Sequence, residues 1–287
     1  MNPTMLPADL IDGLDIRSAT PVAGGDIASA YRLDTSDGPL FCKTHPAPTP
    51  GLFEREAAGL RALREHAPEA LRVPEVLRES SSGLVLEWIT EGDRRTARTE
   101  TTFAVALAQL HRTTNHYFGG LGGIRFGYLG SAQVDLTPSG DWADFYVDRR
   151  VGPLVERAIG QACLDPRARH LIERLRPRAQ ELCGPAEPPA LLHGDLWAGN
   201  RLVDGAGANW LIDPAAYWGH REVDLAMMQL FGGFGPECWP AYNSEFPLAT
   251  GWQDRVAWYQ LPPLLVHAIL FGGSYGDAAL RALARYA

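Results

Sequence analysis

Apolar residues recur at helical spacing along much of the chain. Between positions 51 and 66, Leu52, Phe53, Ala57, Leu60 and Leu63 fall on one face of a helix, which is the spacing of an amphipathic helix packed on a core. The same periodicity predicts a short first helix within residues 6–14 and longer helices over residues 99–112, 141–159, 166–182, 222–231 and 253–271.

The first ninety residues also carry strand signals. The segment DTSDGPLFCKT places a turn before a short apolar strand, and the preceding SAYRL is a strand that can pair with it as a hairpin. A Ser-Ser-Gly turn then leads into LVLEWI, a further strand. We predict an α+β fold with two lobes: a small β-rich lobe over residues 1–90 and a larger, mainly helical lobe over residues 91–287. A ligand cleft is expected where the lobes meet.

Composition narrows the class of protein. The chain has 287 residues, 46% of them hydrophobic, and a formal net charge of −8. This acidic balance argues against binding to nucleic acid or to an anionic membrane, because both need an excess of Lys and Arg. The N-terminus does not resemble a secretory signal, and the apolar run LPPLLVHAILF is too short to span a bilayer. We expect a cytoplasmic protein; the sequence gives no indication of its oligomeric state. The four scattered cysteines argue against a disulfide framework or a zinc site.

The stretch LLHGDLWAGNRLVD, residues 191–204, places several polar side chains between two apolar runs. Asp195 follows a short apolar segment, so its carboxylate can accept a proton from a hydroxyl or orient that hydroxyl. Asn200 offers a carboxamide oxygen, which suits Mg²⁺. Residues 201–203, the turn DGAG and the segment NWLID predict a hairpin that returns Asp213 to Asn200. The carboxylate of Asp213 is therefore expected to bind the same metal ion.

Protein kinases use the same three parts to position a hydroxyl and to neutralise phosphate charge. Two further kinase parts are expected upstream. Lys43 lies on the second strand of the predicted hairpin, where it is expected to bind phosphates. Glu56 lies on the following helix, where it is expected to pair with Lys43.

The nucleotide is expected to contact two more segments. Gly24 and Gly25 would let backbone amides approach the phosphates, although the loop is neither GxGxxG nor a Walker loop. The connection from Glu87 to Ile89 is expected to offer backbone groups to an adenine. The glycine pair alone is a weak signal, whereas the ordered set of elements is specific.

Some residues of these motifs are expected to support the site rather than to react. We predict that His193 braces the loop by hydrogen bonding and that Asp224 anchors or caps it. The repeated FGG at residues 231–233 and 271–273 indicates two helix ends.

The sequence resembles the fructosamine kinases (ketosamine-3-kinases), which are relatives of aminoglycoside phosphotransferases and choline kinases. The resemblance rests on HGDLWAGN, on the long block IDPAAYWGHREVDLAMMQLFGGF, on FEREAAGLRAL and on GGDIASAYRL. HGDLWAGN alone would leave the wider phosphotransferase superfamily open. Trp197 and the long block narrow the resemblance to this family.

The resemblance implies a protein-kinase-like fold and ATP-dependent phosphorylation of the 3-hydroxyl of a ketosamine, the sugar adduct that glycation leaves on an amine. The phosphorylated adduct then breaks down and releases the amine, so the implied role is deglycation of amines or proteins. By this resemblance Asp195 is the catalytic base, Asn200 and Asp213 bind Mg²⁺, and Lys43 with Glu56 positions the phosphates. Trp197 is the candidate wall against which the sugar packs.

The chain departs from the family in places. Asp26 stands near the position of a cysteine in some members, so a redox switch is not carried over. His267 lies where the family commonly has a related NH-containing segment, and the family's substrate contacts near it are not carried over either. The acceptor can be a fructosamine, a ribulosamine, an erythrulosamine or a small glycated amine. An aminoglycoside or a small amino alcohol is an alternative acceptor.

Two other classes of function fit the sequence less well. A metal-dependent hydrolase with His193 and Asp195 as ligands would need further His and Asp ligand motifs, which the sequence lacks. A nucleotide-binding module without catalysis would not need the full set of catalytic residues.

Overall fold

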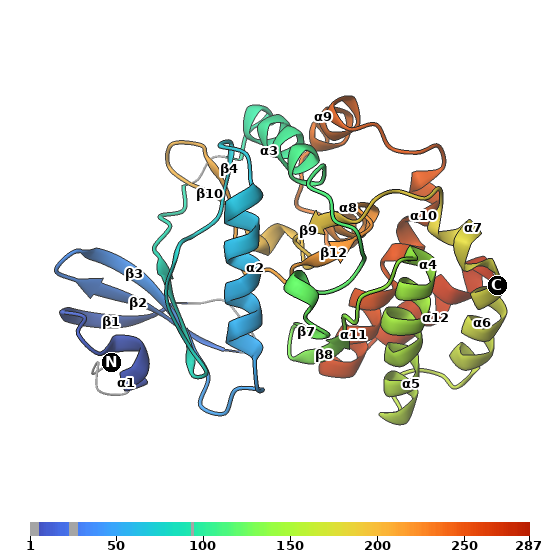
Figure 1. Cartoon of the computed structure of the whole chain (residues 1–287), viewed down its shortest axis with the longest axis horizontal. Coiled ribbons are helices and arrows are strands. Elements are labelled where there is room, and N and C mark those ends of the chain that lie inside the picture. Colours follow the sequence, from blue (N-terminus) through green and yellow to red (C-terminus); the bar gives the residue numbers. More distant parts are fainter. Residues whose placement is uncertain (1–5, 23–27, 93–94) are drawn as a thin grey trace.

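The computed structural model describes residues 6–22, 28–92 and 95–287, and it has two lobes (Figure 1). A twisted β-sheet forms one lobe, and helices make up most of the other. The α+β architecture predicted from the sequence is therefore confirmed. The predicted phosphate contacts Gly24 and Gly25 lie outside the described residues, as does Asp26.

The N-terminal sheet has five antiparallel strands in the order β1-β2-β3-β6-β5. Its two faces follow the alternation of side chains along each strand. In β6, Val85 points toward a small cluster with Leu10, whereas Leu84 and Leu86 join the core beneath the main helix of this lobe. The strands are β1 (Ile16–Val22), β2 (Ser29–Thr35), β3 (Gly38–Thr44), β5 (Val76–Ser80) and β6 (Gly83–Glu87), and α1 (Ala8–Ile11) precedes them.

Helix α2 (Leu52–His66) lies between the sheet and the helical lobe (Figure 1). The predicted apolar face is confirmed, because Phe53, Ala57, Leu60 and Leu63 are all buried. Gly59 lies close to the segment after Asp213: a Cβ on it would come within 3.1 Å of the Ala216 Cβ. This close approach fixes α2 against that segment.

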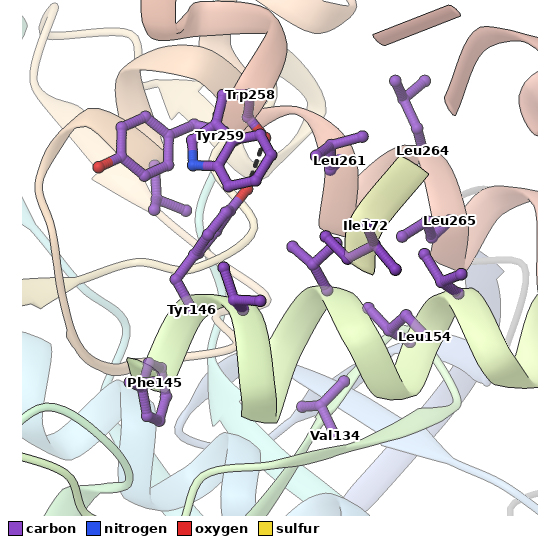
Figure 2. Close-up of a cluster of buried hydrophobic side chains, with 14 of the residues drawn as sticks. Val134, Phe145, Tyr146, Leu154, Ile172, Trp258, Tyr259, Leu261, Leu264 and Leu265 are labelled. Carbon is purple, nitrogen blue, oxygen red and sulfur yellow. Dashed lines mark hydrogen bonds between the residues drawn. The ribbon is translucent and has the colours of Figure 1, made fainter. Parts of the chain in front are cut away.

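The helical lobe contains the remaining long helices. Its core is rich in aromatic side chains, and in Figure 2 the hydroxyl of Tyr146 donates a hydrogen bond to the carbonyl oxygen of Trp258 at 2.6 Å. The helices are α3 (Ala97–Leu110), α4 (Trp142–Asp144), α5 (Gly152–Gly160), α6 (Arg167–Leu175), α7 (Ala179–Cys183), α8 (Glu222–Leu230), α9 (Cys238–Glu245), α10 (Trp252–Tyr259), α11 (Leu261–Phe271) and α12 (Tyr275–Tyr286).

Several elements differ from the sequence expectation. Residues 253–271 form two helices, because Pro262 and Pro263 at the start of α11 lack the N–H groups that would continue α10. Within the predicted helix 141–159, the segment Phe145–Val151 is a π-helix. The glycine-rich segment 119–140 contains a hairpin of β7 (Phe126–Leu129) and β8 (Ala132–Asp135). Strand β1 and helices α9 and α12 were not predicted.

Two small sheets hold the polar loop of residues 193–200. Strand β9 (Ala190–Leu192) leads into the loop and pairs with β12 (Tyr217–Gly219). Strand β10 (Arg201–Val203) leaves the loop and pairs with β11 (Asn209–Leu211), which confirms the predicted hairpin. β11 also pairs in parallel with β4 (Leu71–Arg72), a strand that precedes β5 in the chain.

No helix within the described residues has the length and apolar character needed to cross a membrane. All four cysteines are free thiols.

Candidate active site

A cavity of about 940 Å³ lies between the two lobes, within the size range of pockets for small molecules and cofactors. One part of its wall comes from the sheet, including Val22, Ala30 and Leu86. Another part comes from the helical lobe, including Met227 and Val266. Seven of the predicted site residues line this one cavity: Lys43, Glu56, Glu87, Ile89, Asp195, Asn200 and Asp213. Trp197, the predicted sugar wall, lines it as well.

The loop that carries Asp195 is held in place by the side chain of Asp224, which belongs to α8. The carboxylate of Asp224 accepts hydrogen bonds from the backbone N–H groups of His193 at 2.8 Å and Gly194 at 2.9 Å. It also contacts Nε2 of the buried His111 at 3.2 Å. Gly194 has φ 81°, and a Cβ there would lie 2.2 Å from the carbonyl oxygen of Ala215, so this turn requires glycine.

Both ring nitrogens of His193 are occupied. Nε2 donates to the carbonyl oxygen of Ile212 at 2.9 Å, and Nδ1 accepts from the backbone N–H of Asp195 at 3.3 Å. Burial lowers the pKa of this imidazole, so the neutral form is favoured. This geometry fits the predicted brace and leaves neither nitrogen free for a metal ion. A hydrolase site with His193 as a ligand does not match it.

Asn200 connects the loop to the metal-binding candidates. Its Nδ2 donates to the backbone oxygen of Asp195 at 2.9 Å and to Oδ2 of Asp195 at 3.2 Å. The described part of the chain provides no hydrogen-bond donor to the Asn200 Oδ1, which leaves a hard oxygen available to a cation.

Asp213 is close to Asn200, as the hairpin predicted. The backbone N–H of Ile212 donates to the carbonyl oxygen of Asn200 at 3.1 Å. Asp213 itself has φ 51°, a left-handed conformation that is uncommon outside glycine and that clusters at functional sites. The strained turn directs the Asp213 carboxylate to the cavity, where its Oδ1 lies 3.1 Å from Nζ of Lys43.

Lys43 lies between two carboxylates. Its Nζ is 2.9 Å from Oε2 of Glu56 and 3.1 Å from Oδ1 of Asp213. Burial opposes the charged form of Lys43, but the charges of Glu56 and Asp213 outweigh it and raise its pKa. Burial, against the attraction of Lys43, raises the pKa of Glu56 to about 7. The cluster thus places two carboxyl groups around one ammonium group, and a further cation bound there would favour the ionised form of Glu56.

Asp195 has the electrostatic properties of a general base. Burial first, and the nearby charge of Asp213 second, raise its pKa to about 7. A base with a pKa near the working pH combines a useful fraction of the deprotonated form with a strong tendency to take a proton.

The connection between the lobes also lines the cavity. The backbone N–H of Glu87 donates to the carbonyl oxygen of Glu75 at 3.0 Å, so this amide is not free for an adenine. The backbone of Ile89 makes no hydrogen bond to any described residue, which leaves both of its polar groups available. Of the two residues expected to contact the adenine, Ile89 therefore has free backbone groups, whereas the amide of Glu87 is already hydrogen-bonded.

A group of aromatic side chains in mutual contact, here called the aromatic rim, forms another part of the cavity wall. The indole of Trp197 is 40% exposed and lies over Gly199, where a Cβ would come within 2.1 Å of the ring. The ring of Phe231 meets Trp197 edge-on with centroids 6.3 Å apart, and the Phe231 ring lies 5.1 Å from the ring of His267. The rim consists of Trp197, Phe231, His267, Phe271 and Tyr275.

Sequence reasoning missed most of this rim and also missed Arg150, which lines the same cavity. The two FGG repeats were correctly assigned to helix ends, since α8 ends at Leu230 and α11 at Phe271. The phenylalanine of each repeat nevertheless faces the cavity. The repetition itself was the only signal in the sequence for this role.

Comparison with known proteins decides the family, because the model of the fructosamine kinase family matches residues 4–287. The chain belongs to the fructosamine kinase family. It is 39% identical to a probable ketoamine kinase of Enterococcus faecium over 90% of this chain and 91% of that protein. A solved candidate fructosamine-3-kinase from Thermobifida fusca superposes with a TM-score of 0.88 at 35% identity, covering 97% of this chain and 96% of that chain.

Solved structures of lower sequence identity are similar to this chain in fold alone. A choline kinase from Streptococcus pneumoniae superposes with a TM-score of 0.61 at 15% identity, over 96% of this chain and 95% of that chain. The protein-kinase-like, two-lobe fold expected from the sequence is confirmed.

Proposed function

We propose that this protein is an ATP-dependent kinase that phosphorylates the 3-hydroxyl of a ketosamine, as the names of its relatives indicate. The observation that carries the proposal is the position of Asp195. It is a buried carboxylate with a pKa of about 7, and it lies within one hydrogen bond of Asn200 in a cavity that also contains Lys43 and Asp213.

Asp195 takes the proton of the acceptor hydroxyl while the hydroxyl oxygen forms a bond to the γ-phosphorus of ATP. The bond from that phosphorus to the β,γ-bridging oxygen breaks, and its electrons leave with ADP. The products are the ketosamine 3-phosphate and ADP, and the proton on Asp195 passes to solvent. Such a reaction depends mainly on placement and charge stabilisation.

The donor set near Asp213 fits a Mg²⁺ ion. The free Oδ1 of Asn200 and the carboxylate of Asp213 are hard oxygen ligands, and the surrounding cluster has two carboxyl groups and one ammonium group. Mg²⁺ bound there would neutralise charge on the phosphate oxygens. Lys43, held by Glu56, pairs with the phosphates from the sheet side. Phosphate contacts from Gly24 and Gly25 stay a prediction.

The acceptor occupies the part of the cavity with the aromatic rim. Trp197 presents an indole face beside Asp195, which suits the C–H side of a sugar. Ribulosamine and erythrulosamine adducts belong to the same acceptor class as fructosamine. Loss of the amine from the phosphorylated adduct makes deglycation of small amines or proteins the consequence of the reaction.

A side-by-side acceptor assay tests the proposal. ATP consumption is measured with ribulosamine, erythrulosamine and fructosamine adducts and with an aminoglycoside, and the phosphate position is read from the product by NMR. We expect turnover with at least one ketosamine and phosphate on O3. Turnover with the aminoglycoside alone would instead assign the protein to the alternative acceptor class.

A further inference from the structure

Arg150 is a buried cation that forms no ion pair with any described residue. It is 4% exposed, and its Nε and Nη1 atoms are buried without a hydrogen bond to the described residues. The other buried arginines of the described chain are all paired with a carboxylate. Arg201 bonds to Glu100 at 2.8 Å, Arg221 to Glu187 at 2.7 Å and Arg255 to Glu222 at 2.8 Å.

The surroundings of Arg150 compensate only part of its charge. Its guanidinium lies 4.9 Å from the ring centroid of Tyr217, and such a cation–π contact contributes about 0.5–2 kcal/mol. The ring does not accept the in-plane hydrogen bonds of Nε and Nη1. A buried donor without a partner costs about 1–3 kcal/mol, and more when it is charged. The guanidinium therefore keeps hydrogen-bonding capacity and positive charge that no described residue satisfies.

The backbone around Arg150 is also unusual. Arg150 belongs to the π-helix Phe145–Val151, in which the N–H of the following Gly152 donates to the carbonyl oxygen of Val147. π-Helical turns are rare and occur frequently at functional sites. Arg150 lines the cavity. Because its Nε and Nη1 are buried, Nη2 is the guanidinium nitrogen through which a ligand in the cavity would contact it.

Arg150 belongs to the acceptor side of the cavity. Tyr217, which it contacts, also lies close to Gly194, the residue before Asp195. Strand β8 and helix α11 pack against the π-helix that carries Arg150, and they line the cavity with the apolar residues Val134 and Leu270. Lys43, the cation on the nucleotide side, comes from the opposite lobe and already has two carboxylates. Arg150 has no such carboxylate among the described residues, so a negative group on the acceptor would meet an uncompensated positive charge there.

We propose that Arg150 binds a carboxylate on the amine portion of the acceptor, so that the favoured substrates are ketosamines of free amino acids. This inference rests on the proposed function. A charge-assisted hydrogen bond from Nη2 to a carboxylate oxygen is about twice as strong as a neutral one, and it favours a ligand that carries a carboxylate. In such a substrate the carboxylate is one carbon away from the glycated nitrogen. Its contact with Arg150 would therefore fix the orientation of the ketosamine in the cavity.

The test compares two acceptors that differ only in the carboxylate: the ribulosamine of alanine and the ribulosamine of ethylamine. For the wild-type enzyme we expect a kcat/KM at least tenfold higher with the alanine adduct, mainly through a lower KM. Arg150→Met should abolish this preference and leave kcat/KM for the ethylamine adduct within about threefold. Arg150→Lys, which keeps the charge, should restore part of the preference.

Arg149→Met is the matched control, since Arg149 is the neighbouring residue and contacts the partly exposed Asp135. It should keep the wild-type preference. Equal kcat/KM for the two adducts in the wild type would overturn the inference while leaving the proposed function intact. So would an equal fall in kcat for both adducts in Arg150→Met, which would place Arg150 on the transferred phosphoryl group. Absence of turnover with any ketosamine would overturn the proposed function itself.

Discussion

The side-chain amide of Asn200 donates a hydrogen bond to the carboxylate of Asp195 at 3.2 Å. The residue assigned to the metal ion therefore also holds the residue assigned to the acceptor hydroxyl. This contact couples the two halves of the reaction, the activation of the hydroxyl and the binding of the phosphates. Substitutions at the two positions should not act independently.

Asp195→Asn is expected to lower kcat by about 10²–10⁴-fold, because an amide cannot accept the proton. Asn200→Ala should also lower kcat, and the double variant should be little slower than Asp195→Asn alone. Steady-state kinetics of the three variants check this, with circular dichroism to verify the fold. Full activity in Asp195→Asn would remove Asp195 from the role of base.

The raised pKa of Asp195 predicts a pH-dependent stability difference. Its pKa is about 7 in the folded protein and near its ordinary value in the unfolded chain, so the folded state holds its proton more tightly. Folding is thus favoured by this group at low pH, and that contribution is lost as pH rises from about 4 through 7. Asp195→Asn should be more stable than the wild type at pH 8, by up to about 4 kcal/mol. Near pH 4 the difference should vanish.

Thermal unfolding at the two pH values measures this effect. A stability difference of the same size at both values would mean that the Asp195 charge does not destabilise the folded state.

Lys43→Met is expected to lower kcat/KM for ATP by about 100-fold, since it removes a charge from the phosphates and leaves Glu56 and Asp213 without their partner. Glu56→Gln should act in the same direction but less strongly, because Lys43 keeps Asp213. Initial rates at varied ATP concentration provide the measurement. Arg61→Met, an exposed substitution on the same helix, serves as the control and should leave the rates unchanged.

Trp197→Ala should raise KM for the acceptor by about tenfold and leave KM for ATP unchanged, because the indole contributes mainly apolar contact with the sugar. Gly199→Ala should reproduce part of this effect, since its Cβ would displace the indole that lies over it. Kinetics with the acceptor varied at saturating ATP test both variants. A higher KM for ATP alone would place Trp197 on the nucleotide instead.

Asp224→Ala should destabilise the protein by about 3–5 kcal/mol, because it leaves two backbone N–H groups and His111 without their buried acceptor. Asp277→Asn, at an exposed position of α12, is the control. Chemical denaturation of both variants gives the free energies of unfolding. A loss below about 1 kcal/mol would mean that Asp224 is not the anchor of the loop.

The sequence predicted the parts of this site that depend on nearby residues or on known motifs, and it missed the parts that depend on tertiary packing. The distance between Asn200 and Asp213 was predictable, because a short hairpin fixes it. The pairing of Lys43 with Glu56 was predictable from the resemblance to kinases and from the order of strand and helix. Arg150 was not, because its environment depends on Tyr217 and on a π-helical turn that periodicity does not distinguish from an α-helix. The rim residues Phe271 and Tyr275 likewise reach the cavity only through tertiary packing.

The pairing of β4 with β11 has a consequence for how the molecule unfolds. Leu71 and Arg72 belong to the sequence of the first lobe, yet they complete a sheet whose strand β10 directly follows the polar loop of residues 193–200. The connection after β6 is joined to the same hairpin, because the N–H of Gly92 donates to the carbonyl oxygen of Val203 at 2.8 Å. A chain cut at residue 90 would lose these partners along with the surface that covers α2. The two lobes should therefore melt in a single cooperative transition, and neither should persist as an autonomous folding unit.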